Sequence, residues 1–196
     1  MEVIVMKTAL PIRSKNQVRE FTAYFLQRGE IRNHVLVVLG IHTALRICDL
    51  LRLTWDDVYD FDNRRFRDCI CITEKKTRKT KVLKLNTRVI AALTVYMQTA
   101  VRGGVLFCSR NGENKAITRQ QAYRIIRAGA EDLGFPSRVS CHSLRKTFGY
   151  LAWKADVSPA VIMKVYNHSS IAITQRYLGV TQDDIDDCYS ILADLT

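Results

Sequence analysis

The stretch of sequence that decides the fold runs from residue 141 to residue 179 and reads CHSLRKTFGYLAWKADVSPAVIMKVYNHSSIAITQRYLG. Its first part is predicted to form a helix, in which His142 and Arg145 lie three residues apart and share one face. Apolar side chains recur on another face with the spacing of a helix packed against a core: Leu144, Phe148, Leu151 and Ala152. We therefore expect this helix to be buried on one side and to present a pair of hydrogen-bond donors on the other.

Two further candidate functional residues follow in the same stretch. Ser158 and Pro159 are residue types preferred at the N-cap and the first position of a helix, and His168 comes just after the expected end of that helix. Tyr177 lies in a short amphipathic segment that ends at Gly179. Two imidazoles, a guanidinium and a phenol are the groups that nucleophilic attack on a phosphodiester requires.

An apolar segment over residues 31–45 predicts a central helix, partly interrupted near Gly40, with Arg46 at its far end. A guanidinium in so apolar a setting needs an anion, because burying an unpaired charge is costly. Asp49 lies one turn further on. For these two residues taken alone, a structural Arg46–Asp49 pair is the simplest interpretation.

Residues 66–73 and 81–85 have the character of strands, and the basic sequence EKKTRK at residues 74–79 lies between them. This arrangement predicts an antiparallel hairpin with a basic turn. Runs of charge of this kind are usually solvated loops, so the turn alone does not indicate a function.

Taken together and in this order, these motifs resemble the signature of the tyrosine recombinases, the phage integrase family. The resemblance rests on His142-x-x-Arg145, His168 and Tyr177, on the arginine motif TALRICDLLRL at residues 43–53, and on the lysine motif of the hairpin. It covers nearly the whole chain. It implies a mainly α fold with a small antiparallel β-sheet (α+β), the fold of the tyrosine-recombinase catalytic domain.

The resemblance also implies a role for each motif residue in site-specific DNA recombination. The implied catalytic set is Arg46, Lys76, His142, Arg145, His168 and Tyr177. The planar fork of an arginine binds two phosphate oxygens and keeps its proton, so Arg46 and Arg145 would clamp the phosphate. Tyr177 would attack it to form a 3′-phosphotyrosyl enzyme, Lys76 rather than Lys75 would protonate the leaving oxygen, and Asp49 or a neighbour would orient Arg46. The reaction implied needs no metal, ATP or other cofactor.

The net charge of +11, from 30 Lys and Arg against 19 Asp and Glu, favours a polyanionic partner, most simply double-stranded DNA. A helix is predicted after Thr118, and it carries basic and aromatic side chains at four-residue spacing on one side. A solvated face explains that stripe adequately, whereas the resemblance favours DNA contact, chiefly with phosphates. The candidate DNA-binding residues are Lys75, Arg78, Lys79, Arg119, Tyr123 and Arg127.

Two positions depart from the family pattern, since Ala44 and Arg78 stand where the family commonly has glycine. We expect residues 1–196 to form a single catalytic domain, with a lead-in over residues 1–13 and a tail helix over residues 181–196 that packs on its own domain or is exchanged between protomers. The family's N-terminal core-binding domain is expected to be absent. By resemblance, the chain would form a homo-oligomer on DNA, a tetramer in the family, and a monomer or dimer without DNA.

The remaining sequence features narrow the setting. The six cysteines form no CxxC pair, which argues against a zinc module or a disulfide framework. No apolar run has the length of a signal sequence core or a membrane span, so we expect a cytoplasmic protein that does not bind membranes. A zinc site at Cys141, His142 and His168 is disfavoured because their spacing matches no standard metal pattern.

Two other functions fit much of the same sequence. A type IB topoisomerase would use the same chemistry to relax supercoils without exchanging strands. A DNA-binding regulator with this fold would not cleave DNA at all, although all six catalytic positions are filled.

Overall fold

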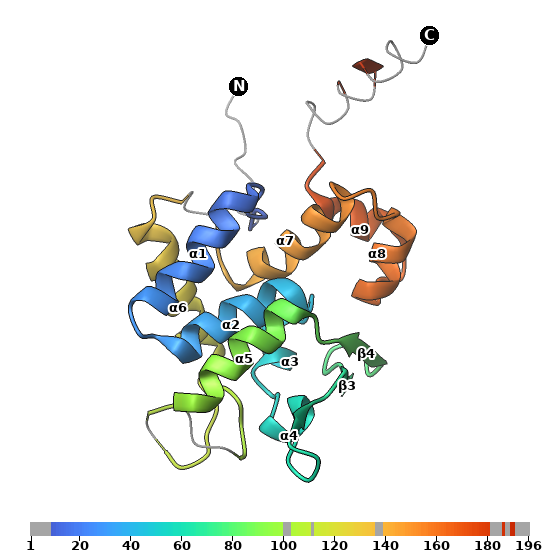
Figure 1. The fold of residues 1–196 in the computed structure, drawn as a ribbon. Helices are drawn as coiled ribbons and strands as arrows, with labels where there is room; N and C mark the ends of the chain where they lie inside the picture. The colour runs from blue at the N-terminus through green and yellow to red at the C-terminus, as the bar shows by residue number, and fades with distance from the viewer. Residues whose placement is uncertain are drawn as a thin grey trace.

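The computed structural model describes residues 9–99, 103–110, 112–135 and 139–180, together with residues 186, 189 and 190. Within these ranges the chain is mainly helical with two small antiparallel sheets, which confirms the predicted fold class (Figure 1). The helices are α1 (Lys15–Gln27), α2 (Ile31–His42), α3 (Ile47–Leu50), α4 (Trp55–Val58), α5 (Thr87–Thr99), α6 (Arg119–Asp132), α7 (Cys141–Trp153), α8 (Pro159–Tyr166) and α9 (Ile171–Leu178). The strands are β1 (Tyr59–Asp60), β2 (Arg65–Phe66), β3 (Cys69–Thr73) and β4 (Thr80–Lys84).

Helix α2 lies at the centre of the fold and packs against α1, α5 and α7 (Figure 1). Every residue of α2 from His34 to Ile41 is buried, as expected for a helix that is apolar on all sides. The predicted interruption near Gly40 is wrong, because the helix continues to His42. Gly40 serves packing instead: a Cβ at this position would lie 2.5 Å from Leu144 Cδ1, so only glycine lets α7 approach this closely.

The chain turns sharply between α2 and α3. The Thr43 hydroxyl donates to the Leu39 carbonyl at 2.7 Å and accepts from the Leu45 amide at 3.3 Å, which ends the helix. Ala44 then takes a left-handed conformation with φ of 54°, and Arg46 becomes the N-cap of α3. The glycine that the family commonly has at position 44 is therefore explained by the backbone conformation of this turn.

The predicted hairpin forms between β3 and β4, with Thr73 opposite Thr80 at the closed end. Ile70 and Leu83 face the core. In the turn, the Glu74 amide donates to the Lys79 carbonyl at 3.0 Å and the Arg78 amide donates to the Glu74 carbonyl at 2.9 Å. These bonds fix the backbone on both sides of the basic run.

Arg78 has a φ of 58°. Like Ala44, it occupies a position where the family commonly has glycine. Arg78→Gly should therefore raise the free energy of unfolding by about 1 kcal/mol, because it removes the contact of Cβ with the backbone in this region. Urea denaturation measures the change. Arg78→Ala is the matched control: it removes the same charge but keeps Cβ, and equal stabilisation by the two variants would contradict the explanation.

Helices α7, α8 and α9 form the C-terminal part of the described fold (Figure 1). Ser158 caps α8 by accepting from the Ala160 amide, with Pro159 at the first position, as predicted. Asn167 ends α8 in a left-handed conformation with φ of 53°, which places His168 between α8 and α9. Glycine at position 149 leaves the space that the Tyr166 hydroxyl fills.

The structure describes only part of the predicted N-terminal lead-in and of the predicted C-terminal tail helix. Of the expected lead-in, residues 9–13 are described, and the Ile12 amide donates to the Thr147 hydroxyl of α7 at 2.8 Å. The expected tail helix over residues 181–196 lies outside the described residues apart from residues 186, 189 and 190. Among the helices that the structure describes, none combines the length and the apolar character that a membrane crossing requires.

Candidate active site

Arg145 connects the elements that form the candidate site. Its side chain is buried, with Nη1 donating to the Ala44 carbonyl and Nη2 donating to the Tyr166 carbonyl at 2.9 Å. Its guanidinium lies over the Tyr166 ring, 4.5 Å from the centroid. Arg145 thereby ties α7 to the turn after α2 and to the end of α8. Its Nε is also buried and has no hydrogen-bond partner among the described residues.

Tyr177 lies between the two imidazoles. The centroid of its ring is 5.1 Å from that of His142 and 4.7 Å from that of His168, and the Arg145 guanidinium is 5.8 Å from it. His168 is oriented by a 3.0 Å hydrogen bond between Nδ1 and the Thr174 hydroxyl of α9. Four residues that are spread over residues 142–177 of the sequence therefore form one cluster.

The environment of both histidines favours the neutral imidazole. Burial lowers the pKa of His142 to about 4, and the charges of Lys146 and Arg145 act in the same direction. Burial likewise lowers the pKa of His168 to about 4, with Arg145 and Arg46 as the next causes. A neutral imidazole has one N–H donor and one acceptor nitrogen, so at neutral pH each ring is able to take up a proton or to donate a hydrogen bond.

Arg46 does not form the predicted pair with Asp49. Its Nη1 lies 2.8 Å from Oε1 of Glu74, which the structure places in the buried end of the hairpin turn. Asp49 accepts instead from the Lys75 amide at 2.8 Å, and its Oδ1 lies 3.8 Å from the Arg52 guanidinium. Sequence spacing suggested the nearer carboxylate, whereas the fold brings the hairpin turn across the end of α2. Asp49 thus holds the backbone of the hairpin turn at Lys75.

The two candidate lysines differ in their surroundings. Lys76 is exposed at the tip of the turn, and its charge is among those that lower the pKa of His142, so it lies near the cluster. The Lys75 side chain is also exposed, but its backbone is held by Asp49. The charge of Lys76 therefore acts on His142, whereas Lys75 is held through its backbone by Asp49.

The amino-acid sequence matches a known family. The sequence model described as the phage integrase family matches residues 13–183, which is most of the chain. The chain belongs to this family. The match confirms the resemblance that the sequence motifs indicated.

Two curated proteins illustrate how this chain relates to other members of the family. The probable integrase/recombinase YoeC of Bacillus subtilis (strain 168) is 33% identical over 190 residues, which cover 97% of this chain and 100% of YoeC. Tyrosine recombinase XerC of Neisseria gonorrhoeae is 27% identical over 162 residues, which cover 81% of this chain and 50% of XerC. The chain thus spans the full length of YoeC and about half the length of the XerC and XerD relatives that it matches.

Solved structures of tyrosine recombinases share the fold. XerA recombinase superimposes with a TM-score of 0.75 at 19% sequence identity, covering 93% of this chain and 63% of XerA. XerH recombinase bound to palindromic difH substrate gives a TM-score of 0.75 at 18% identity, covering 95% of this chain and 54% of XerH. At these identities the comparison establishes the common fold.

Two charged residues of the site were not selected from the sequence. Glu74 is the one acidic residue of the basic run at residues 74–79, and no local sequence motif indicates a role for it. Lys81 lies on the inward face of β4 with Leu83, and its ammonium donates to the Thr43 carbonyl at 3.4 Å. Burial and the charge of Arg145 lower the pKa of Lys81 to about 7. The two-residue period of β4, which places Lys81 on the apolar face, is the signal that would have found it.

The proposed DNA-contacting residues of α6 differ in how free their side chains are to bind. Arg119 and Tyr123 are exposed. Arg127 forms an ion pair with Glu131 of the same helix. Arg119 lies close enough to Cys141 of α7 to influence the pKa of its thiol, which burial raises to about 11. The start of α6 is thus next to the start of α7, where His142 lies.

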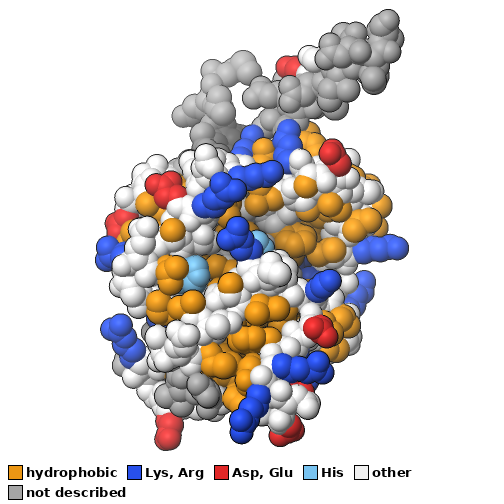
Figure 2. Space-filling model, in the orientation of Figure 1, with side chains coloured by type: hydrophobic (Ala, Val, Ile, Leu, Met, Phe, Trp, Pro, Cys, Tyr) orange, Lys and Arg blue, Asp and Glu red, His pale blue; other side chains and the backbone are white. Residues whose placement is uncertain are grey.

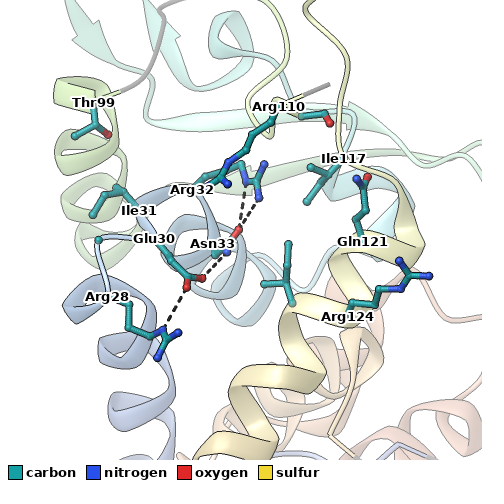
Figure 3. Close-up of a pocket in the computed structure, with 13 residues that line it drawn as sticks. Arg28, Glu30, Ile31, Arg32, Asn33, Thr99, Arg110, Ile117, Gln121 and Arg124 are labelled. Atoms are coloured by element: carbon teal, nitrogen blue, oxygen red, sulfur yellow. Dashed lines mark hydrogen bonds and ion pairs between the residues drawn. The ribbon is translucent and has the colours of Figure 1, made fainter. Parts of the chain in front are cut away.

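A large cavity lies apart from this cluster. It has a volume of about 940 Å³ and contains none of the residues selected from the sequence. It lies at the opposite end of α2, around Arg28, Arg32, Arg110 and Arg124 (Figure 3). Arg28 pairs with Glu30, and Arg32 donates to the Cys108 carbonyl at 2.8 Å. The residues selected by the sequence motifs therefore do not line this cavity.

The surface charge agrees with the composition on the face that Figure 2 shows. Lys and Arg side chains are spread across this face, and the acidic side chains lie mainly toward its edges (Figure 2). In the part of the chain that the structure describes, no three His, Cys, Asp or Glu side chains gather as they would around a metal ion.

The Arg46–Glu74 pair has a measurable effect on stability. Arg46→Gln should lower the free energy of unfolding by about 3–5 kcal/mol, because Glu74 would remain buried without its guanidinium partner. Adding Glu74→Gln should recover most of this loss, since the double variant no longer buries the Glu74 carboxylate without its Arg46 partner. Urea denaturation of the two variants measures both effects. A single variant as stable as the wild type, or a double variant no more stable than the single, would contradict the pairing.

Proposed function

We propose that the chain is a site-specific DNA recombinase that cleaves and rejoins double-stranded DNA through a 3′-phosphotyrosyl intermediate on Tyr177. The observation that carries this proposal is the convergence of two guanidiniums, two neutral imidazoles and a phenol around the buried side chain of Arg145. Membership of the phage integrase family supports the same reaction.

In the proposed cleavage step, the Tyr177 oxygen attacks phosphorus and gives its proton to a neutral imidazole of His142 or His168. Negative charge gathers on the non-bridging oxygens, where Arg46 and Arg145 donate hydrogen bonds to it. The bond from phosphorus to the 5′-oxygen breaks, and Lys76 protonates that oxygen as it leaves. A P–O bond is broken and another is formed, so the phosphotyrosyl intermediate conserves the bond energy.

Rejoining follows the same path in reverse. A 5′-hydroxyl, from the same or from a second duplex, attacks the phosphotyrosyl bond and returns the Tyr177 hydroxyl. Lys76 then accepts the proton that it gave up in cleavage. The proposed steps of strand exchange between two duplexes therefore use neither ATP nor a metal ion.

The proposed partner is double-stranded DNA, and the proposed assembly on DNA is a homo-oligomer, a tetramer by family resemblance. XerH recombinase has been solved with palindromic difH substrate in a post-cleavage complex, and the integrase of the Tn1549 transposon with transposon right end DNA. The phosphate contacts on this chain would come from Lys75, Lys79 and Arg78 of the hairpin turn and from Arg119, Tyr123 and Arg127 of α6. Such binding weakens steeply as salt rises. Because the proposed substrate is DNA, we also propose that the protein is located in the cytoplasm.

Covalent capture from a pool of DNA tests the proposal without knowledge of the target sequence. The pool consists of duplexes randomised on both sides of a nick, so that cleavage releases a short strand and traps the protein on the DNA. We expect a denaturant-stable protein–DNA adduct that forms in the presence of EDTA and without ATP, enriched in related sequences. No adduct from any part of the pool would favour a DNA-binding protein that does not cleave.

The captured sequence also separates the recombinase from a type IB topoisomerase. Two duplexes that carry the recovered site, with arms of different length, should give recombinant products when incubated together with the protein. Relaxation of supercoiled DNA without any such products would instead indicate a topoisomerase.

A further inference from the structure

Glu74 occupies the position between the arginines where the phosphate should bind. Its side chain is fully buried, and Oε1 lies 2.8 Å from Arg46 Nη1 and 3.9 Å from Arg145 Nη1. Burial acts to raise the pKa of Glu74, but the Thr77 hydroxyl and Arg46 hold it below its usual range, so the group is a carboxylate at neutral pH. Without DNA, the anion of the clamp is thus supplied by the protein.

The carboxylate fits this position less well than a phosphate would. Arg46 Nη1, Glu74 Oε1 and Arg145 Nε are buried, and none of the three makes a well-aligned hydrogen bond among the described residues. The two arginines therefore keep donor capacity that a flat carboxylate leaves unused. A phosphodiester presents its non-bridging oxygens tetrahedrally and can accept from both guanidiniums.

Glu74 is also part of the turn that carries Lys76. Its Oε2 accepts from the Thr77 hydroxyl at 2.7 Å and from Asn167 Nδ2 at 3.4 Å. Its backbone makes both of the hydrogen bonds that close the turn, to Lys79 and Arg78. The side chain that fills the clamp is therefore also hydrogen-bonded to the segment that presents the lysine.

We propose that Glu74 is a positioning residue that stands in for the reacting phosphate until DNA displaces it, and that this displacement releases the turn that carries Lys76. This inference rests on the proposed DNA-cleaving function. Once a phosphate takes Arg46 and Arg145, the carboxylate lies beside a like charge and has lost its cationic partners, so it leaves the buried position. Its departure breaks the Thr77 contact and frees Lys76 to move to the leaving oxygen. Lys76 is thereby released when a phosphate is bound.

Glu74→Gln tests the displacement because it keeps the shape of the side chain and removes its charge. DNA binding is measured in the Tyr177→Phe background, so that no cleavage disturbs the equilibrium, with the duplex recovered by capture. We expect Glu74→Gln to tighten binding at least about tenfold. Asp56→Asn is the matched control, since Asp56 is exposed on α4, which carries no residue of the cluster, and its loss changes the net charge equally.

A second duplex tests whether the gain in affinity comes from displacement of Glu74 by the phosphate, from the change in net charge or from a structural effect of the substitution. It carries a neutral methylphosphonate in place of the reacting phosphate. The affinity gained by Glu74→Gln should disappear on this duplex, because an uncharged group does not compete with the carboxylate. The proposal is overturned if Glu74→Gln weakens binding, if its gain equals that of Asp56→Asn, or if the gain persists with the methylphosphonate. If Glu74→Gln does not fold, Glu74→Asp replaces it: the shorter side chain holds Arg46 less closely, so a smaller gain is expected, again confined to the charged duplex.

Inorganic phosphate keeps the test independent of DNA cleavage. Titrated phosphate should raise the unfolding temperature of Glu74→Gln more than that of the wild type or of Asp56→Asn, because the free clamp binds the anion. Equal shifts in all three proteins would count against displacement. If the phosphate result holds while capture fails, the assignment of Glu74 stands and the recombinase function does not.

Discussion

Tyr177→Phe should lower covalent capture of DNA by at least about a thousandfold, because it removes the attacking oxygen and leaves the rest of the cluster in place. The phenyl ring retains the contacts that the Tyr177 ring makes with His142, His168 and the Arg145 guanidinium. DNA affinity should therefore change little. Gel analysis of denatured capture reactions measures the adduct, and a binding titration measures the affinity.

Tyr166→Phe is the matched control, since Tyr166 belongs to the same cluster but its hydroxyl donates to the Arg145 carbonyl at 2.5 Å. This variant should still capture DNA and should lose about 1–2 kcal/mol of stability, the usual effect of removing one buried hydrogen bond. Capture that survives in Tyr177→Phe and vanishes in Tyr166→Phe would reassign the nucleophile.

Lys76→Ala should slow cleavage of normal DNA by about a hundredfold to ten-thousandfold, the range for loss of a general acid. The physical reason is that the 5′-oxygen is a poor leaving group unless it is protonated as its bond to phosphorus breaks. Sulfur in place of that oxygen leaves readily without a proton. A duplex with a bridging 5′-sulfur at the cleaved position should therefore restore most of the rate of Lys76→Ala.

Lys75→Ala serves as the control for this experiment, because Lys75 is the exposed neighbour in the same turn. It should weaken DNA binding modestly and leave the rate of cleavage in the bound complex unchanged. Rescue by sulfur in Lys75→Ala, and not in Lys76→Ala, would assign the general acid to Lys75. A Lys76→Ala rate that stays low with both substrates would show that Lys76 does not protonate the leaving group.

Local sequence patterns predicted the elements that carry the site. The helical spacing of His142 and Arg145, the cap at Ser158, and the hairpin around the basic run all follow from short-range rules that the structure bears out. These rules depend on residues within one or two turns of each other. Local sequence patterns therefore predict structural features of this kind well.

The partner of Arg46 lies beyond the reach of such rules. Spacing pointed to Asp49, three residues away, while the fold selects Glu74, which is twenty-eight positions along the chain. A long-range pair is decided by how β3 and β4 lie across the end of α2, and no local pattern encodes that arrangement. No local pattern explains Gly40 either, because its lack of a side chain makes room for Leu144 of another helix.

The two departures from the family pattern were visible in the sequence, but their meaning was not. Ala44 and Arg78 both have positive φ, so the backbone keeps the conformation that glycine normally serves even though the residue differs. Only the dihedral angles show that these turns are retained.

The residue attached to DNA is the most direct test of the central claim. Captured complexes are digested with nuclease and trypsin, and the nucleotide-bearing peptide is sequenced by mass spectrometry. Cleavage after Arg176 yields the peptide over residues 177–196, which contains both Tyr177 and Tyr189, so fragmentation must place the adduct. We expect a 3′-nucleotide phosphate on Tyr177; attachment at Tyr189 or at any other residue would contradict the account.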